Sequence, residues 1–220
     1  MIITIDGPVG SGKSSVAQAL AKRLKIHYLN TGLLYRAAAY ILINKLKKAP
    51  ENIGPLNENE LSLLDKITYE FVENDPTVYF ENEALTDDLY NLSLDRPASL
   101  VSQDKQVRER LSHIQKNIAE KYDIVAEGRD LGSVVFPNAD YKFFLTASVD
   151  IRAQRVAFDE KRNIKDNNLE KVKKEIELRD ERDETREVSP LIVPNNAFIV
   201  DNSNLTFEET VQEFLRQIQK

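Results

Sequence analysis

The chain has 220 residues, a formal net charge of −6 and no cysteine. This length suits one α/β domain with a sizeable core, and the acidic balance argues against a constitutive nucleic-acid or anionic-membrane surface. Disulfide bonds and thiolate metal sites are excluded, and the lack of a long apolar run or a signal-peptide pattern leads us to expect a cytoplasmic protein.

A glycine-rich segment near the N-terminus is the strongest motif. The apolar run Ile2–Asp6 predicts a strand, the periodic run Ser14–Leu24 predicts a helix, and the residues from Gly7 to Ser14 between them satisfy G-x-x-x-x-G-K-[ST]. The glycines let backbone N–H groups turn inward beside the helix N-terminus. We therefore expect a polyphosphate-binding loop, with Lys13 on the β and γ phosphates and the Ser14 hydroxyl as a direct protein ligand of Mg²⁺.

The next elements are less regular. Residues Ile26 to Leu29 predict a short extended segment, Thr31 and Gly32 predict a break in the chain, and Leu33–Lys47 predicts a helix. A loop marked by proline and glycine is expected over residues 49–57.

A small antiparallel insert is expected in the middle of the chain. Apolar and polar residues alternate from Ile67, a turn is expected over Glu73–Pro76, and a second strand pattern follows. The segment Pro97–Lys121 predicts a single helix with one apolar stripe.

The second half alternates short apolar runs with longer periodic segments. This pattern is typical of a mostly parallel sheet covered by helices. Thr206 and Glu209 predict a capping box for a final helix. The expected strands are 124–126, 141–145 and 197–200, and the expected charged helices are 150–162 and 169–182.

Several arginines fall where strands end. Arg36 lies one turn into a helix, and Arg129 and Asp130 directly follow a strand, so all three are expected at the sheet edge that carries the phosphate loop. An Arg–Asp pair there can be a loop-fixing ion pair or part of a substrate site. The shared edge favours a substrate site, and arginine suits phosphate because its fork is bidentate.

Two further charged segments leave alternatives open. The run Glu177–Arg186 fits either a solvated helix end with i,i+4 ion pairs or a functional surface. Arg152 and Arg155 fit either an exposed helix face or a lid that supplies charge to a transferring phosphoryl group.

The chain resembles bacterial cytidylate kinases over nearly its whole length, and four segments carry the resemblance. The most specific is the block Gly128-Arg129-Asp130-x-Gly-x-Val-Val-Phe-Pro, and the resemblance also covers the segments Asp6–Pro8, Thr31–Arg36 and Arg179–Arg186. It implies an α/β P-loop NTPase fold: a three-layer arrangement with a parallel sheet flanked by helices. It also implies one nucleoside monophosphate kinase domain over residues 1–220, with a monophosphate-binding insert at about 58–100 and a helical lid at about 150–186.

The resemblance also implies roles for individual residues. Ser99, Arg108 and Asp130 are expected to recognise the cytosine, with Asp130 accepting a hydrogen bond from its N4 amine. Thr31, Arg36, Arg129 and Arg186 are expected to hold the acceptor phosphate, and Arg179 with Asp183 to contact the sugar. Asn202 and Ser203 are expected to line the adenine pocket, largely through backbone. The expected catalytic residues are Lys13, Arg129, Arg152, Arg155 and Arg186. The expected ATP-binding residues are Gly7, Pro8, Val9, Gly10, Ser11, Gly12, Lys13, Ser14, Ser15, Asn202 and Ser203. The expected CMP-binding residues are Thr31, Arg36, Ser99, Arg108, Arg129, Asp130, Arg179, Asp183 and Arg186.

The implied activity is transfer of the γ-phosphoryl group of Mg·ATP to CMP and dCMP, by a monomer without nucleic-acid or membrane partners. Two alternatives stay open: a P-loop kinase for another small acceptor, and a nucleotide-hydrolysing switch. Asp130 argues against an acceptor without a nucleobase. The chain has no Asn-Lys-x-Asp guanine-recognition motif, which argues against a GTP switch.

Overall fold

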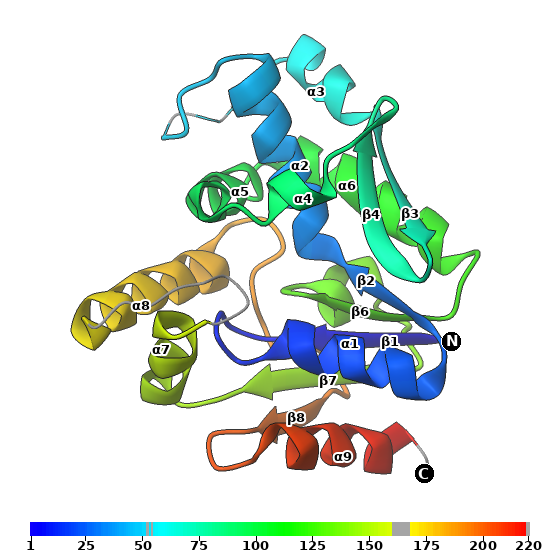
Figure 1. Cartoon of the computed structure of the whole chain (residues 1–220), viewed down its shortest axis with the longest axis vertical. Coiled ribbons are helices and arrows are strands. Elements are labelled where there is room, and N and C mark those ends of the chain that lie inside the picture. Colours follow the sequence, from blue (N-terminus) through cyan, green and yellow to red (C-terminus); the bar gives the residue numbers. More distant parts are fainter. Residues whose placement is uncertain (52, 54, 160–167, 219–220) are drawn as a thin grey trace. The chain divides into compact units, whose positions relative to one another are not determined.

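The computed structural model describes residues 1–51, 53, 55–159 and 168–218 (Figure 1). The chain forms two compact units: the first joins Met1–Ile26 to Asp123–Lys220, and the second is His27–Tyr122. The insert expected at about 58–100 falls inside the second unit. In the described part of the chain, no helix has the length and apolar character that crossing a membrane requires.

Parallel strands form the sheet of the first unit, as expected for an α/β fold. They follow the order β6-β1-β7-β8, and Ile3 of β1 pairs with Val125 on one side and Tyr141 on the other. Ile3, Thr4 and Ile5 are fully buried, because strands covered on both faces bury successive side chains. The bounds are β1 Ile2–Asp6, β6 Ile124–Gly128, β7 Tyr141–Thr146 and β8 Phe198–Asp201.

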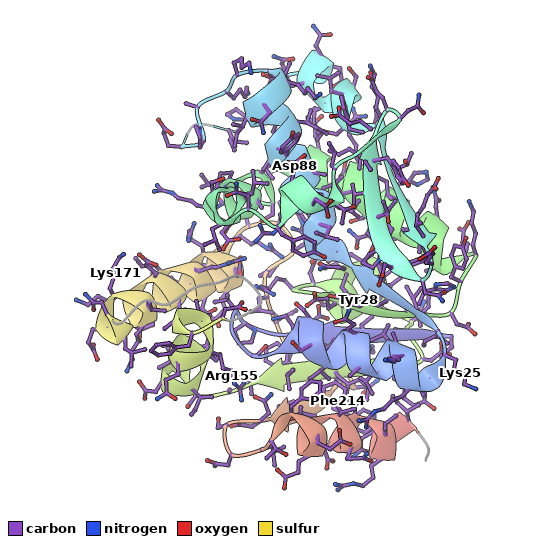
Figure 2. All side chains as sticks on the ribbon, viewed as in Figure 1. Lys25, Tyr28, Asp88, Arg155, Lys171 and Phe214 are labelled. Atoms are coloured by element: carbon purple, nitrogen blue, oxygen red, sulfur yellow. The ribbon has the colours of Figure 1, made fainter. Side chains whose placement is uncertain are left out.

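Helices α1 (Lys13–Leu24) and α9 (Phe207–Ile218) pack on each other and on this sheet (Figure 1). Phe214 of α9, labelled in Figure 2, stacks on Phe143 of β7 with ring centres 4.3 Å apart. The predicted capping box before α9 is confirmed. The Thr206 hydroxyl accepts from the Glu209 N–H at 3.2 Å, and the Glu209 carboxylate accepts from the Thr206 N–H at 2.8 Å.

Helices α7 (Val149–Ala157) and α8 (Leu169–Thr185) lie side by side (Figure 1). They share a small apolar core of Ala153, Ala157, Val172 and Ile176. The expected lid helix 150–162 ends at Ala157 in the structure, and residues 160–167 of the expected lid lie outside the described residues.

A buried carboxylate joins β1 to the segment after β6. Asp6, the last residue of β1, accepts from the Leu131 N–H at 2.9 Å and from the Gly132 N–H at 2.7 Å. Both donors lie in the first turn of η3, a π-helix spanning Leu131–Val135. These first-turn N–H groups have no partner within the helix, so Asp6 serves as their acceptor.

The second unit contains the expected antiparallel insert. Strands β3, β4 and β5 form one sheet, and the turn falls at Glu73 and Asn74, both with positive φ. The turn predicted over Glu73–Pro76 is thus shorter, because Asp75 and Pro76 already belong to β4. The bounds are β2 His27–Asn30, β3 Ile67–Val72, β4 Asp75–Phe80 and β5 Glu83–Ala84.

Two expectations for helices of the second unit are wrong. The chain does not break at Thr31 and Gly32, which form the first turn of α2. The single helix expected over 97–121 is two helices, because the Asp104 side chain accepts from the Gln106 and Val107 N–H groups and starts a new helix there. The helices are α2 Thr31–Tyr40, η1 Ile41–Lys45, α3 Glu58–Leu64, α4 Thr86–Leu89, η2 Leu92–Leu94, α5 Asp95–Val101 and α6 Lys105–Ala119.

We expect Asp6→Asn to lower the free energy of unfolding by about 1–3 kcal/mol at pH 7. An amide has one acceptor oxygen, so one of the two buried N–H groups loses its partner. Urea denaturation followed by circular dichroism measures the change. Asp140→Asn is the matched control, since Asp140 accepts from the Ile2 N–H at the exposed start of the same strand, where water replaces the bond. Equal losses in the two variants would contradict the prediction.

Candidate functional site

The phosphate loop of the first unit is tightly enclosed by its own unit. Gly7 and Gly10 have φ values of +149° and +76°. A Cβ on Gly7 would lie 2.0 Å from the Leu145 carbonyl oxygen, and one on Gly10 would lie 2.9 Å from the Arg152 carbonyl oxygen. Only glycine fits at these two positions, because the loop runs directly against the end of β7 and against α7.

Carbonyl groups of the loop accept hydrogen bonds from cationic side chains. Lys13 Nζ donates to the Pro8 carbonyl at 2.6 Å and to Ser11 Oγ at 3.3 Å. Arg152 Nη1 donates to the Val9 carbonyl at 3.0 Å. Lys13, expected on the phosphates, and Arg152, expected among the catalytic residues, therefore both contact the loop.

Asn202, directly after β8, connects the loop to α7. Its Nδ2 donates to the Ser11 carbonyl at 3.1 Å, while its Oδ1 accepts from Arg155 Nη1 at 2.9 Å and its carbonyl from Arg155 Nη2 at 3.1 Å. Figure 2 shows Arg155 on α7. The neighbouring Ser203 Oγ accepts from the Ser148 N–H at 2.8 Å. The resemblance assigns Asn202 mainly a backbone role, whereas here its side chain joins Arg155 to the loop.

Two carboxylates of α8 are buried and paired with arginines. Asp180 Oδ2 lies 2.5 Å from Arg152 Nη1, and Asp183 Oδ2 lies 2.9 Å from Arg129 Nε. Asp180 and Asp183 are only 8% and 5% exposed. The solvated-helix interpretation of residues 177–186 therefore does not hold for these two residues, which face the arginines of the candidate site.

Burial and nearby charges shift the pKa values of the site. Burial alone would raise the pKa of Asp183, but the Arg129 and Arg179 guanidinium groups outweigh it and lower that pKa. Burial, together with Arg129, holds the pKa of Lys13 well below its ordinary value. Positive groups are thus gathered closely enough to oppose one another's charge, which a polyanionic ligand would relieve.

Asp130 and Arg186 form a buried pair. Arg186 Nη2 lies 3.7 Å from Asp130 Oδ1, and both side chains are almost completely buried. Arg186 Nε also donates to the Ser189 carbonyl, which fixes the guanidinium just after α8. The structure thus brings together, within the first unit, the arginine and the carboxylate that the resemblance assigns to the acceptor phosphate and base.

Thr31 and Arg36, predicted on the acceptor side, both lie on α2 in the second unit. Thr31 is buried in the first turn, next to Asn30, whose N–H donates to Tyr69 Oη at 3.0 Å. Arg36 is paired with Asp95, and its Nη1 donates to the carbonyls of Leu89 and Asn91. These contacts fix the direction of the Arg36 side chain.

Ser99 and Arg108, predicted for base recognition, are 8% and 4% exposed. Arg108 Nη1 donates to the Ser102 carbonyl at 3.0 Å, and Ser102 Oγ donates to the Ser99 carbonyl at 2.9 Å. Among the described residues, Ser99 Oγ has no hydrogen-bond partner although it is buried. A buried hydroxyl of this kind is a candidate contact for a polar ligand atom.

The residues present fit a Mg²⁺ ion that is held mainly by a nucleotide. Ser14 is exposed in the first turn of α1, where its hydroxyl can serve as one oxygen ligand. Both Asp6 oxygens already accept backbone N–H groups. Within the described ranges, no cluster of three His, Cys, Asp or Glu residues could hold a metal by itself. Magnesium in P-loop enzymes is shared in this way with the phosphates.

Sequence reasoning gave no role to Asp6 or Asp180. Asp6 was visible only as part of the Asp-Gly-Pro start of the loop, and its partners lie more than 120 residues away. Asp180 carried a signal, because it is adjacent to Arg179 in the dense charge run of α8, but spacing alone does not say which acid is buried.

A family model described as cytidylate kinase matches residues 3–220. The cytidylate kinase of Chlamydia caviae (strain ATCC VR-813 / DSM 19441 / 03DC25 / GPIC) is 40% identical over 98% of this chain and 96% of its own length. The chain belongs to the cytidylate kinase family. The family member from Clostridioides difficile (strain 630) is 35% identical over 99% of this chain and 98% of its own length.

Other similar proteins extend beyond this chain or share only the fold. A bifunctional pantoate ligase/cytidylate kinase of Prochlorococcus marinus (strain MIT 9312) is 40% identical over 97% of this chain, which spans 42% of that relative's length. A crystal structure of an uncharacterized protein from Eubacterium ventriosum ATCC 27560 has a TM-score of 0.56 at 14% identity, covering 100% of this chain and 99% of that one. TT1252 from Thermus thermophilus has a TM-score of 0.51 at 16% identity, covering 100% and 96%. At these identities the likeness to solved structures shows a common fold.

The Asp6 carboxyl generates a pH dependence of stability. Burial raises its pKa from 3.8 to about 6. The folded protein therefore binds this proton more tightly than the unfolded chain, so the stability that protonation of Asp6 adds is full below pH 3.8 and is lost as the pH rises through about 6. A pKa shift of this size corresponds to a change of about 3 kcal/mol in the free energy of unfolding between low and high pH. The hydrogen bonds from the Leu131 and Gly132 N–H groups remain at pH 7.

We therefore expect the excess stability of the wild type over Asp6→Asn to be larger at pH 4 than at pH 7. Urea denaturation of both proteins across this range measures the difference in unfolding free energy. A difference that does not change with pH would show that the Asp6 carboxyl titrates normally in the folded protein.

Proposed function

We propose that this protein transfers the γ-phosphoryl group of Mg·ATP to CMP and dCMP. The observation that carries the proposal is the closeness of Lys13, on the phosphate loop, to Arg129 and Arg179, which the family pattern assigns to the acceptor. Their charges help to lower the pKa of Lys13. A cationic region that joins the donor loop to acceptor arginines suits a reaction between two phosphate groups.

On the donor side, the proposal places the triphosphate in the loop formed by residues 7–15. Lys13 contacts the β and γ phosphates, and Arg152 and Arg155 of α7 add positive charge beside the loop. Asn202 and Ser203, which tie α7 to the end of β8, contribute to the adenine pocket.

On the acceptor side, the family pattern assigns residues to both units. In the first unit, Arg129 and Arg186 bind the acceptor phosphate, Arg179 and Asp183 bind the sugar, and Asp130 accepts from the cytosine N4 amine. In the second unit, Thr31 and Arg36 bind the phosphate, and Ser99 and Arg108 bind the base.

The chemistry needs no general base, because the acceptor phosphate oxygen is already ionised near neutral pH. Catalysis comes from aligning two anions and neutralising their charge. Bound Mg²⁺, with Ser14 as a ligand, would supply part of that neutralisation. The stretch 150–186 serves as a lid that excludes water, which is the competing phosphoryl acceptor.

A coupled ADP-release assay over a panel of acceptors tests this function. We expect turnover of Mg·ATP with CMP or dCMP, little with UMP or AMP, and none without an acceptor. Turnover without any acceptor would instead support a nucleotide-hydrolysing switch. A preference for another acceptor would support a different small-molecule kinase.

We expect Lys13→Ala to reduce kcat by at least about 10²-fold while the protein stays folded. Lys13 stabilises charge on the transferring group, and removing a buried amine with a lowered pKa removes a desolvation cost. ADP release and circular dichroism measure the two effects separately. Lys22→Ala, at an exposed position of the same helix, is the control. An unfolded Lys13→Ala protein, or one with near-normal turnover, would remove the role assigned to Lys13.

We expect Asp130→Asn to narrow the preference for CMP over UMP, which should be roughly tenfold to a hundredfold in the wild type. A carboxylate accepts from the N4 amine but repels the O4 of uracil, whereas an amide pairs with either after flipping. The measurement is kcat/KM for both acceptors, with the exposed Asp140→Asn as control. Full discrimination by Asp130→Asn would place base recognition elsewhere.

A further inference from the structure

Tyr35 of α2 lies against an arginine to which the proposed function assigns base recognition. The Cζ atom of Arg108 is 5.2 Å from the centre of the Tyr35 ring. Arg108 is 4% exposed and comes from α6, so the contact is largely shielded from water. Cation–π contacts gain strength when they are desolvated in this way.

A short series of hydrogen bonds continues from Arg108 to Ser99. Arg108 Nη1 donates to the Ser102 carbonyl, and Ser102 Oγ donates to the Ser99 carbonyl. The Ser99 hydroxyl is buried and has no hydrogen-bond partner in the described part of the chain. Tyr35 thus stands at one end of a connected group, and a hydroxyl available to a ligand stands at the other.

Helix α2 carries two neighbouring contacts with different partners. Arg36, next to Tyr35, is paired with Asp95 of α5, while Tyr35 contacts Arg108 of α6. Two consecutive residues of α2 therefore serve the two assigned roles. Arg36 is itself assigned to the acceptor phosphate, and Tyr35 supports Arg108, which is assigned to the base. Arginine has a long side chain with many rotamers, so its placement depends on such supports.

We propose that Tyr35 is a positioning residue for acceptor specificity, holding the Arg108 guanidinium through the face of its ring. This inference rests on the proposed function, because it presumes that Arg108 contacts the base of the acceptor. The ring face carries the effect, and the Tyr35 hydroxyl is not required.

The test compares Tyr35→Leu with Tyr35→Phe in the ADP-release assay. For Tyr35→Leu we expect the KM for CMP to rise roughly threefold to thirtyfold, which is the range of a partly buried cation–π contact. The KM for ATP should stay unchanged and the preference for CMP over UMP should fall. Tyr35→Phe keeps the ring face and should restore near-normal values.

Tyr40→Leu is the matched control. Tyr40 is half-buried on the same helix, and its hydroxyl lies 3.5 Å from Asp88, so its loss perturbs the helix surface without touching Arg108. We expect its KM for CMP to remain normal. If Tyr35→Leu does not fold by circular dichroism, Tyr35→Met replaces it as the variant without a ring.

A double-mutant cycle with Arg108→Met tests whether Tyr35 acts through Arg108. In that background, Tyr35→Leu should have little further effect on the KM for CMP. Additive effects would overturn the inference, as would normal CMP kinetics in Tyr35→Leu or equal losses in Tyr35→Phe and Tyr35→Leu.

A wild-type protein that does not use CMP would overturn the proposed function and, with it, the positioning role. CMP turnover with unaffected Tyr35 variants would overturn the positioning role alone.

Discussion

The backbone of the phosphate loop imposes the constraint from which much of the first unit follows. A loop that turns its N–H groups toward a ligand leaves its carbonyl groups facing the protein, and buried carbonyls need donors. Here the carbonyls of Pro8, Val9 and Ser11 receive donors from Lys13, Arg152, Arg155 and Asn202. Three of these donors, Lys13, Arg152 and Arg155, are also the cations to which the proposed function assigns charge neutralisation. Satisfying the loop therefore concentrates positive charge beside it.

Buried acids balance that concentration of charge at defined points. Asp180 pairs with Arg152 and Asp183 pairs with Arg129, so α8 supplies one carboxylate to each of these two arginines. Asp6 has a different task, because it holds backbone N–H groups of η3 rather than a side-chain cation. Its contacts fix the start of the segment that follows Asp130. The buried acids of the first unit thus have two roles: Asp180 and Asp183 neutralise arginines, and Asp6 fixes the backbone.

The local parts of this arrangement could be predicted from the sequence, and the long-range parts could not. The loop, β1 and the capping box of Thr206 with Glu209 depend on residues a few positions apart, and all three were correctly predicted. The break between helices α5 and α6 at Asp104 was missed, because an N-cap residue within an amphipathic pattern looks like any other polar position of a helix.

The partners of Asp6 lie across the sheet, and no local pattern indicates them. Whether Asp180 is buried or solvated depends on packing of α8 on α7, which helical spacing does not reveal. Lys13 and Ser14 were singled out by the loop motif, and Arg36, Arg129 and Asp130 by their positions after strands. Ser99, Arg108, Asn202 and Ser203 were found only through the family resemblance, because no local pattern marks them.

One packing detail of the loop bears on how relatives of this protein could be recombined. Val9 packs on the apolar core shared by α7 and α8, and its carbonyl accepts from Arg152. Position 9 thus packs against a helix pair that begins only at Val149, far along the chain. A chimera that imports α7 and α8 from a family member with another residue at position 9 would place a core packed for that residue against Val9. Exchange of the helix pair should therefore include position 9, so that the loop and its neighbours are transplanted as one unit.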